Sequence, residues 1–141
     1  MTQVNITTIN HLMYNLLLRF IYLFIHIPLM GYKKRQNWIL AQKNIFKNLK
    51  TNQEKCIWIH CSSLGEYEYI KPLIPELKKI NPLIIITFFS PSGYENFKDF
   101  DLINQISYLP LDLKENIITF TNTINPMMVI IAKNEIWPNM I

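Results

Sequence analysis

Short apolar runs alternate with polar, helix-like segments through the second two-thirds of the chain, and this alternation is the feature that most limits the fold. Four runs have the length of strands: residues 56–60, 84–88, 105–109 and 127–131. The run at 84–88 is rich in β-branched residues, which suits a strand buried on both faces. Strands that alternate with helices favour parallel pairing through right-handed crossovers. We therefore predict an α/β fold with a Rossmann-like, doubly wound parallel sheet.

The segments between these runs predict helices and also indicate where a ligand would bind. The predicted helices cover residues 66–80, 92–100 and 113–123. Pro72 and Pro75 should kink the first helix or delay its regular part until about Lys71. Ligands of such sheets bind outside the carboxyl ends of the strands. The candidate segments are therefore those that follow the strands: residues 60–66, 89–93, 110–112 and 132–137.

An apolar run at residues 12–30 is close to the roughly 20 residues needed to cross a bilayer. Arg19 near its centre makes a full span costly, and Asn15 and His26 are also polar. Three basic residues follow at 33–35, where they favour the cytoplasmic side and anionic headgroups. Three alternatives remain open: a helix lying in the cytoplasmic leaflet, a single span, or a buried helix of a soluble protein. We predict a membrane-associated helix, and no cleaved signal peptide.

Charge divides the chain of 141 residues unevenly, although its net charge is only +4. Residues 1–55 carry eight basic side chains and one acid, whereas residues 56–141 carry six lysines and nine acids. At residues 36–50, apolar side chains recur near helical spacing with lysines between them, which predicts a second helix. This helix could lie on an anionic surface or pack on a domain. We predict three parts: an apolar helix with a basic flank (1–35), an amphipathic basic helix or linker (36–55) and a Rossmann-like domain (56–141).

Composition and missing motifs exclude several classes of protein. With 50% hydrophobic and 17% charged residues, the chain is not a disordered tail. Cys56 and Cys61 are too few for a disulfide scaffold and lack the spacing of a zinc site, so we expect two buried or half-buried thiols. The basic residues form no recognised nucleic-acid motif. The sequence also lacks a dinucleotide fingerprint, a P-loop, a nucleophile elbow and an HExxH helix.

The loop after the first predicted strand holds small polar residues at the start of a helix. Ser62, Ser63 and Gly65 allow a tight turn whose N–H groups could bind an anion or a sugar hydroxyl. Glu66 would lie in the first helical turn, where its carboxylate could accept a proton from a bound hydroxyl. It could equally be an acid that interacts with the helix dipole. His60 is predicted to be a packing residue at the strand end.

The other three loops add hydroxyls, a glycine and two carboxylates to the same predicted edge. Ser92 and Gly93 could cap the next helix or hold a phosphate. Asp112 is predicted to be the N-cap of the helix that follows the third strand. Glu135 follows the fourth strand and would face the same edge as Glu66.

Together these four loops resemble the N-terminal domain of the 3-deoxy-D-manno-octulosonic acid (Kdo) transferases of lipid A biosynthesis. The matching stretches are residues 58–66, 87–93, 108–112 and 135–139. Each follows or ends a predicted strand, and they occur in the family's order. The resemblance extends over residues 10–141, including the apolar N-terminal helix and its basic flank.

The resemblance implies an inverting glycosyltransferase of the GT-B type, in which two Rossmann-like domains face a cleft. Such an enzyme transfers Kdo from CMP-Kdo to the lipid A precursor (lipid IVA) during lipopolysaccharide core biosynthesis, at the cytoplasmic face of the inner membrane. It implies no metal and no cofactor beyond the donor substrate. Glu66 matches the family's general base and Glu135 a supporting carboxylate. Matches to acceptor-binding positions are Ser62, Ser63, Gly65, Ser92 and Gly93.

The chain departs from this family in two respects. Lys133 and Asn134 stand where many members carry an acid and a small polar residue, which could alter acceptor contacts. The sequence stops just after the Trp-Pro-Asn motif, so the CMP-binding positions of the donor domain have no counterpart. We expect an N-terminal fragment that does not turn over CMP-Kdo alone. The alternatives are a non-catalytic, membrane-associated lipid-binding, sugar-binding or scaffold domain, and a small soluble flavodoxin-like module.

Overall fold

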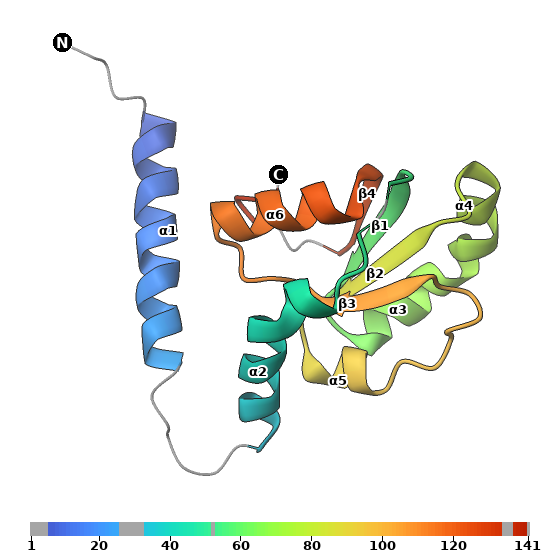
Figure 1. Ribbon diagram of the computed structural model, residues 1–141, viewed down its shortest axis with the longest axis horizontal. Helices are drawn as coiled ribbons and strands as arrows, with labels where there is room; N and C mark the ends of the chain where they lie inside the picture. The colour runs from blue at the N-terminus through green and yellow to red at the C-terminus, as the bar shows by residue number, and fades with distance from the viewer. Residues whose placement is uncertain (1–5, 26–32, 52, 134–136, 141) are drawn as a thin grey trace.

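A computed structural model describes residues 6–25, 33–51, 53–133 and 137–140 of the chain (Figure 1). Two helices, α1 (Ile6–Ile25) and α2 (Lys33–Asn48), precede the α/β body. Figure 1 shows α1 standing to one side of this body, near the start of α6, whereas α2 lies against the sheet. The second predicted helix is thus confirmed, and its packing on a domain is the alternative that the structure shows.

The sheet has the predicted parallel arrangement. Its strands are β1 (Cys56–Cys61), β2 (Ile84–Phe88), β3 (Gln105–Tyr108) and β4 (Pro126–Ala132). Their order is β3-β2-β1-β4, and all three pairings are parallel. In the centre, Ile59 of β1 is in register with Ile86 of β2 and Ile130 of β4. Because the strands are parallel, their carboxyl ends meet at one edge of the sheet.

The helices between the strands agree with the sequence in position but not always in length. They are α3 (Leu64–Ile70), the 3-10 turn η1 (Lys71–Leu73), α4 (Ile74–Ile80), α5 (Pro91–Glu95) and α6 (Lys114–Ile124). The kink predicted from Pro72 and Pro75 is confirmed, because each proline begins a new helical segment. A delayed start at Lys71 is wrong, since α3 already begins at Leu64. The helix predicted at 92–100 is shorter and ends at Glu95.

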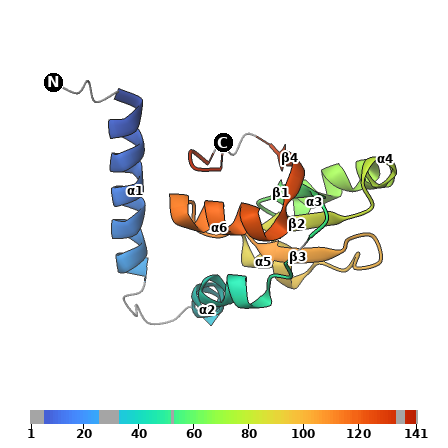
Figure 2. The ribbon, with the colours of Figure 1, turned by 45° about the horizontal axis from the view of Figure 1, so that its top comes forward.

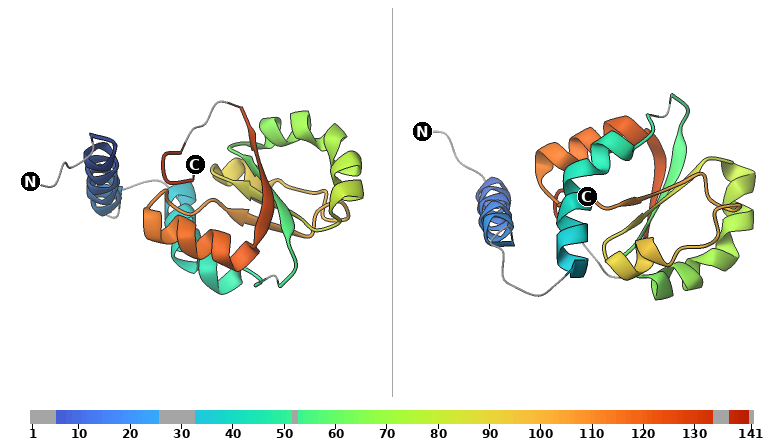
Figure 3. Two further views of the ribbon diagram at one scale, coloured as in Figure 1. Left: turned by 90° about the horizontal axis from the view of Figure 1, so that it is seen from above. Right: turned by 60° about the horizontal axis from the view of Figure 1, so that its bottom comes forward.

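The central strands separate two apolar clusters, and this explains the layers of the fold. On one face Ile57, Ile59 and Phe88 pack with Tyr67 and Ile74 from α3 and α4. The opposite cluster joins α2 and α6 to the sheet: Ile45, Leu49, Trp58, Ile85, Phe120 and Ile124. Figures 2 and 3 show this division, with α2 and α6 on one face and α3 and α4 on the other. Every residue of β1 and β2 is buried, as expected for a sheet covered on both sides.

Several elements leave large apolar side chains in solvent, among them β4 and α1. On the edge strand β4, Met127, Met128 and Val129 are 38–49% exposed. On α1 six apolar side chains are 43–63% exposed: Leu12, Met13, Leu16, Leu17, Phe20 and Ile21. The described side chains of α1 are therefore not part of the apolar core of the α/β body.

The predicted N-terminal helix is present, but it begins at Ile6 rather than at residue 12. Residues 26–30 of the predicted apolar run lie outside the described residues. In the part of the chain that the structure describes, no helix has both the length and the hydropathy that crossing a bilayer requires.

Candidate active site

The loops after β1, β2 and β3 are joined at the carboxyl edge of the sheet. The amide of Ser90 donates to the carbonyl of Ser62 at 2.9 Å, which links the first two loops. The amide of Leu109 donates to the carbonyl of Phe88 at 2.8 Å, which links the second and third. The edge therefore brings the predicted Ser62–Glu66 and Ser90–Gly93 segments together, as the sequence indicates.

Glu66 is held by the loop in which it lies. Ser63 is the N-cap of α3, and its hydroxyl accepts from the amide of Glu66 at 3.4 Å. The carboxylate of Glu66 turns back, and its Oε2 accepts from the amide of Ser62 at 2.6 Å. Glu66 is 9% exposed. Among the described residues no hydrogen bond reaches its Oε1, so the bond at Oε2 is the one that orients the carboxylate.

The same geometry gives Glu66 a structural role. Ser63 and Glu66 have the S-x-x-E spacing of a capping box, except that the carboxylate bonds the amide one residue before the N-cap. Sequence reasoning considered the helix dipole and missed this spacing, although the four residues 63–66 display it. Both interpretations of Glu66, as helix-start acid and as proton acceptor, are compatible with its position.

A buried polar chain lies behind Ser62 and fixes its surroundings. The indole Nε1 of Trp58 donates to the hydroxyl of Thr87 at 2.9 Å, and that hydroxyl lies 3.0 Å from Nδ1 of His60. Nε2 of His60 lies 3.4 Å from the hydroxyl of Ser62. His60 is 1% exposed, so its predicted burial at the strand end is confirmed, and its described partners are polar.

Both cysteines are free and buried, as predicted. Burial, with a smaller contribution from the charge of Glu66, raises the pKa of Cys61 to about 12. Burial also raises the pKa of Cys56 to about 11. Both thiols are therefore neutral near pH 7, and neither is poised as a nucleophile or as a metal ligand. Among the described residues, no group of three or more His, Cys, Asp or Glu could hold a metal ion.

The second loop is a helix cap whose glycine is required by packing. Ser90 is the N-cap of α5, and its hydroxyl accepts from the amide of Gly93 at 3.3 Å. The Ser90 and Ser92 hydroxyls are 2.8 Å apart, and Ser92 is exposed. A Cβ on Gly93 would overlap the ring of Phe88. Gly65 differs, because the nearest atom to its added Cβ is 3.9 Å away.

Asp112 is not the N-cap that the sequence predicts. Leu113 occupies that position in α6 and has no side-chain cap. Asp112 is instead 1% exposed, and its Oδ2 accepts from the hydroxyl of Tyr14 at 2.9 Å and from the amide of Asn139 at 3.0 Å. These two donors lie far from Asp112 in the sequence, so the local pattern could not reveal them. Burial raises the pKa of Asp112, although both donors lower it.

The fourth loop is described only in part. Glu135 lies outside the described residues, so the structure does not place this predicted carboxylate. Lys133 has a positive φ of 80°, the left-handed region, and its side chain is exposed. After the gap, Trp137 packs against Phe89 of the second loop with ring centroids 5.1 Å apart. The segment that follows Glu135 therefore returns to the same edge.

Two residues of α2 fix this edge, and sequence reasoning missed both. The indole of Trp38 donates to the carbonyl of Phe89 at 3.1 Å. The amide side chain of Gln42 donates to the carbonyl of Leu109 at 2.9 Å and accepts from the amide of Leu111 at 3.2 Å. Gln42 lies at helical spacing between Trp38 and the buried Ile45. A polar residue on the apolar face was the available signal.

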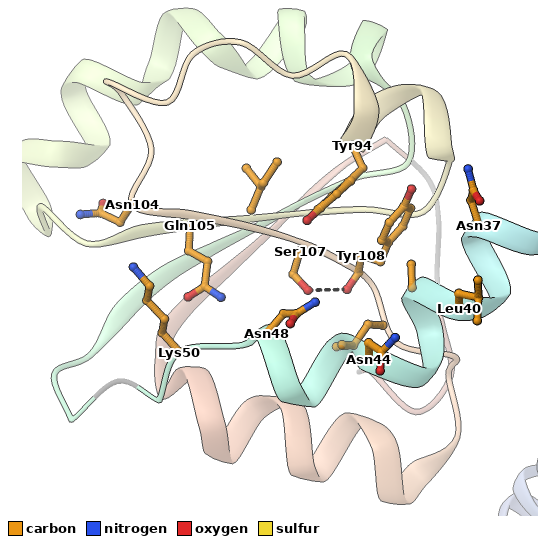
Figure 4. Close-up of a pocket in the computed structure, with 13 residues that line it drawn as sticks. Asn37, Leu40, Asn44, Asn48, Lys50, Tyr94, Asn104, Gln105, Ser107 and Tyr108 are labelled. Atoms are coloured by element: carbon orange, nitrogen blue, oxygen red, sulfur yellow. Dashed lines mark hydrogen bonds between the residues drawn. The ribbon is translucent and has the colours of Figure 1, made fainter. Parts of the chain in front are cut away.

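A cavity among the described residues does not have Glu66 in its walls. It has a volume of about 410 Å³ and lies between α2 and the free edge of β3 (Figure 4). Its walls are mostly amides and two stacked tyrosine rings, Tyr94 and Tyr108, whose centroids are 4.3 Å apart. The amides are Asn37, Asn44, Asn48, Asn104 and Gln105. This groove is therefore separate from the carboxylate site at the carboxyl edge.

Comparison with known proteins connects the site to a family. The sequence model of the family described as 3-Deoxy-D-manno-octulosonic-acid transferase (kdotransferase) matches residues 34–141. This range includes all four strands and the first three loops of the site.

Three curated proteins are similar to the chain. A bifunctional glycosyltransferase/methyltransferase of Fusobacterium nucleatum is 38% identical over 136 residues, covering 92% of this chain. A 3-deoxy-D-manno-octulosonic acid transferase of Haemophilus influenzae is 40% identical over 88 residues (60% of this chain). Another, of Aquifex aeolicus, is 32% identical over 91 residues (64%). The matches cover only 20%, 21% and 26% of these relatives' own lengths.

Proposed function

Because the chain belongs to the family of 3-deoxy-D-manno-octulosonic acid transferases, we propose that it supplies the acceptor side of a glycosyltransferase that passes Kdo from CMP-Kdo to the lipid A precursor, lipid IVA. The observation that carries this proposal is the position of Glu66. Its carboxylate lies at the carboxyl edge of a parallel sheet, with Oε2 held by the Ser62 amide and Oε1 without a described partner. A Rossmann-like sheet that binds its ligands at this edge suits a GT-B acceptor domain.

In the proposed reaction Glu66 is the general base. An acceptor hydroxyl is a poor nucleophile, so Glu66 removes its proton as the oxygen attacks the anomeric carbon of Kdo. The new bond forms between that oxygen and the anomeric carbon, and the bond from Kdo to CMP breaks. CMP leaves with the bonding electrons, and its charge is stabilised by a donor domain. A single displacement of this kind inverts the anomeric configuration and needs no metal.

The neighbouring loops support the proposed acceptor site in different ways. Ser62, Ser63 and Gly65 form the turn that presents Glu66, and the exposed hydroxyl of Ser92 lies at the edge of the second loop. Gly93 contributes by packing against Phe88, since its amide is already bonded to Ser90. In this proposal Glu135 is a supporting carboxylate contributed by the fourth loop.

We also propose that α1 holds the protein on the cytoplasmic face of the inner membrane. Its exposed apolar side chains would lie in the headgroup region of the lipid, as in helices that lie along a membrane surface. The basic residues at 33–35 would add attraction to anionic headgroups. An acceptor embedded in the bilayer would then meet the carboxyl edge directly.

The general base is best tested in a chimera, because the chain spans only about a fifth of the Haemophilus influenzae relative. Residues 34–141 would replace the matching segment of that enzyme, and transfer of Kdo to lipid IVA would be measured. Glu66→Gln keeps the acceptor for the Ser62 amide but removes the base, so we expect turnover to fall by about 10²–10⁴-fold.

Glu68→Gln is the matched control, since this exposed carboxylate lies on the same helix. It should leave turnover unchanged. Activity that survives Glu66→Gln would refute the base assignment. A chimera that binds lipid IVA but is inactive even with Glu66 present would favour a non-catalytic lipid- or sugar-binding domain.

A further inference from the structure

A buried carboxylate joins three segments that are far apart in the sequence. Asp112, just before α6, accepts from Tyr14 of α1 at 2.9 Å and from the amide of Asn139 at 3.0 Å, both through Oδ2. The side-chain amide of Asn139 also donates to the carbonyl of Asp112. The same amide donates to the side-chain oxygen of Asn15 at 3.0 Å. Helix α1 and the Trp-Pro-Asn motif are thus bonded to one another and to Asp112.

The burial of Asp112 makes its two donors important. Asp112 is 1% exposed, and its Oδ1 is buried without a hydrogen-bond partner among the described residues. A buried carboxylate is costly unless donors compensate for lost water. The donors from Tyr14 and Asn139 therefore hold Asp112 in place, and Asp112 in turn holds them. Loss of either donor leaves the carboxylate with a single bond at Oδ2.

The same contacts set how α1 is rotated about its axis. Tyr14 and Asn15 are half-buried against the body, whereas Leu12, Leu16 and Phe20 point into solvent. One other polar contact of α1 with the body is the ion pair of Arg19 with Glu115 at 2.6 Å, in which both side chains are more than half exposed. Exposed pairs contribute little. The bond of Tyr14 to the buried Asp112 and the bonds of Asn15 to Asn139 and Lys114 are therefore the polar contacts that orient the helix.

We propose that Asp112 is a positioning residue that couples the seating of α1 to the position of residues 137–140, the segment that directly follows Glu135. Each segment is bonded to the same carboxylate, so order in one favours order in the other. Such coupling is reciprocal by thermodynamic linkage. Its consequence on a membrane surface rests on the proposed function, whereas the coupling itself does not.

Tyr14→Phe is the most informative variant, because no described hydrogen bond joins Tyr14 to residues 137–140. The substitution removes one hydroxyl and leaves the ring. In the 141-residue chain, NMR hydrogen exchange would be measured at the amide of Asn139, at α1 and at the core strands. We expect the Asn139 amide to exchange about fivefold faster, the effect of losing roughly one hydrogen bond, together with faster exchange in α1.

Glu115→Gln is the control, since it removes the ion pair between α1 and α6 without touching Asp112. It should leave the Asn139 amide unchanged. If Tyr14→Phe accelerates α1 alone, the coupling is refuted. Equally faster hydrogen exchange at the amides of Ile59 and Ile86, in the central strands, would indicate global destabilisation. This result would also count against the proposal.

Asn139→Ala tests the reverse direction and does not depend on the Tyr14 variant. It removes the side-chain bonds to Asp112 and Asn15. We expect about fivefold faster exchange in the α1 amides near Tyr14, with the core strands unchanged. Unchanged exchange in α1 would refute the coupling.

Vesicles separate this inference from the proposed membrane contact. With vesicles of phosphatidylglycerol and phosphatidylethanolamine, binding through α1 should slow exchange at Asn139 in the original chain but not in Tyr14→Phe. If the vesicles protect α1 and leave Asn139 unaffected in the original chain, the coupling is refuted. If the vesicles do not bind at all, the membrane proposal fails, and the exchange result in solution still decides the coupling.

Discussion

The two helices that precede the sheet both carry apolar side chains, yet the fold uses these side chains in opposite ways. Helix α2 buries Ile45 in the core beside Trp58, and Leu49, directly after the helix, is buried there too. Helix α1 leaves Leu16, Phe20 and four further apolar side chains in solvent and contacts the body through polar groups. The difference teaches that an apolar face at helical spacing does not itself reveal its partner. In α2 the partner is the sheet, and in α1 we propose that it is a membrane surface.

The largest expected effect comes from truncating the buried face of α2. Ile45→Ala should lower the free energy of unfolding by about 2–5 kcal/mol, because it removes a side chain that is 4% exposed and leaves a cavity. Leu16→Ala in α1, at 58% exposure, should change it by less than about 0.5 kcal/mol. Urea unfolding of both variants measures the contrast. Equal losses would mean that α1 is packed as tightly as α2.

For vesicle binding, in contrast to stability, a substitution in α1 should have a larger effect than one in α2. Phe20→Ala removes a large exposed side chain from α1 and should weaken binding to anionic vesicles by about tenfold or more, if the ring enters the lipid. Phe46→Ala removes an exposed ring from α2 and serves as the control, at 37% exposure. Co-sedimentation with vesicles provides the measurement. A larger loss with Phe46→Ala would place the membrane surface on α2 instead.

The polar side of α2 should matter almost as much as its apolar side. Gln42→Leu keeps the volume but leaves the carbonyl of Leu109 and the amide of Leu111 without their partner. We expect a loss of about 1–3 kcal/mol in the free energy of unfolding, since both groups would stay buried or half-buried. Lys43→Leu alters the neighbouring exposed position and should be nearly neutral. A neutral Gln42→Leu would show that the third loop does not depend on α2.

A smaller effect should appear as a pH dependence where α1 meets the body. The pKa of Asp112 is raised in the folded state, so folding favours its protonated form. Its favourable contribution is complete below the ordinary pKa of 3.8 and is lost as the pH rises through the folded pKa. The original chain should therefore lose stability as the pH rises from acid to neutral, and Asp112→Asn should not show this loss. The free energy of unfolding of the variant, relative to that of the original chain, should thus increase with pH. Urea unfolding at both pH values gives the difference, and a shift of opposite sign would contradict it.

The smallest effect is expected for the exposed ion pair that also joins α1 to the body. Arg19→Ala removes its contact with Glu115 and should cost less than about 1 kcal/mol, because both side chains are more than half exposed. Thermal melts at low and high salt would measure it. A loss as large as that of Gln42→Leu would mean that the ion pair, rather than Asp112, anchors the helix.

Local patterns predicted most of the fold. The strand at Ile84–Phe88 has the predicted bounds because a run of β-branched residues between turn signals favours a strand. The break between α3 and α4 follows from Pro72 and Pro75, whose rings prevent regular hydrogen bonding. Where a residue restricts its own backbone conformation, the sequence was sufficient to predict the secondary structure.

The site was predicted less completely, because its contacts join distant segments. The sequence placed Glu66 at the correct edge, but the bond from the Ser62 amide depends on a turn geometry that only the spacing of the capping box could have suggested. Asp112 was assigned to a cap, although donors 98 and 27 residues away draw it inward. Gln42 was overlooked for the same reason, as its partners belong to a loop that follows β3. A local pattern does not name the partner of a long-range hydrogen bond, even where a polar residue on an apolar face, such as Gln42, indicates that one exists.

The parallel order β3-β2-β1-β4 also determines when each strand can pair with its neighbours during translation. The central strand β1 gains one neighbour early, but its second neighbour must wait until Ala132, the partner of Cys61, has been made. At about 5–20 residues per second, ribosomes need about 4–14 s to make those intervening residues. During that interval one side of this strand, which is fully buried in the finished fold, is without its partner on the nascent chain. Chaperones that shield unpaired strand edges should therefore matter most before β4 is complete.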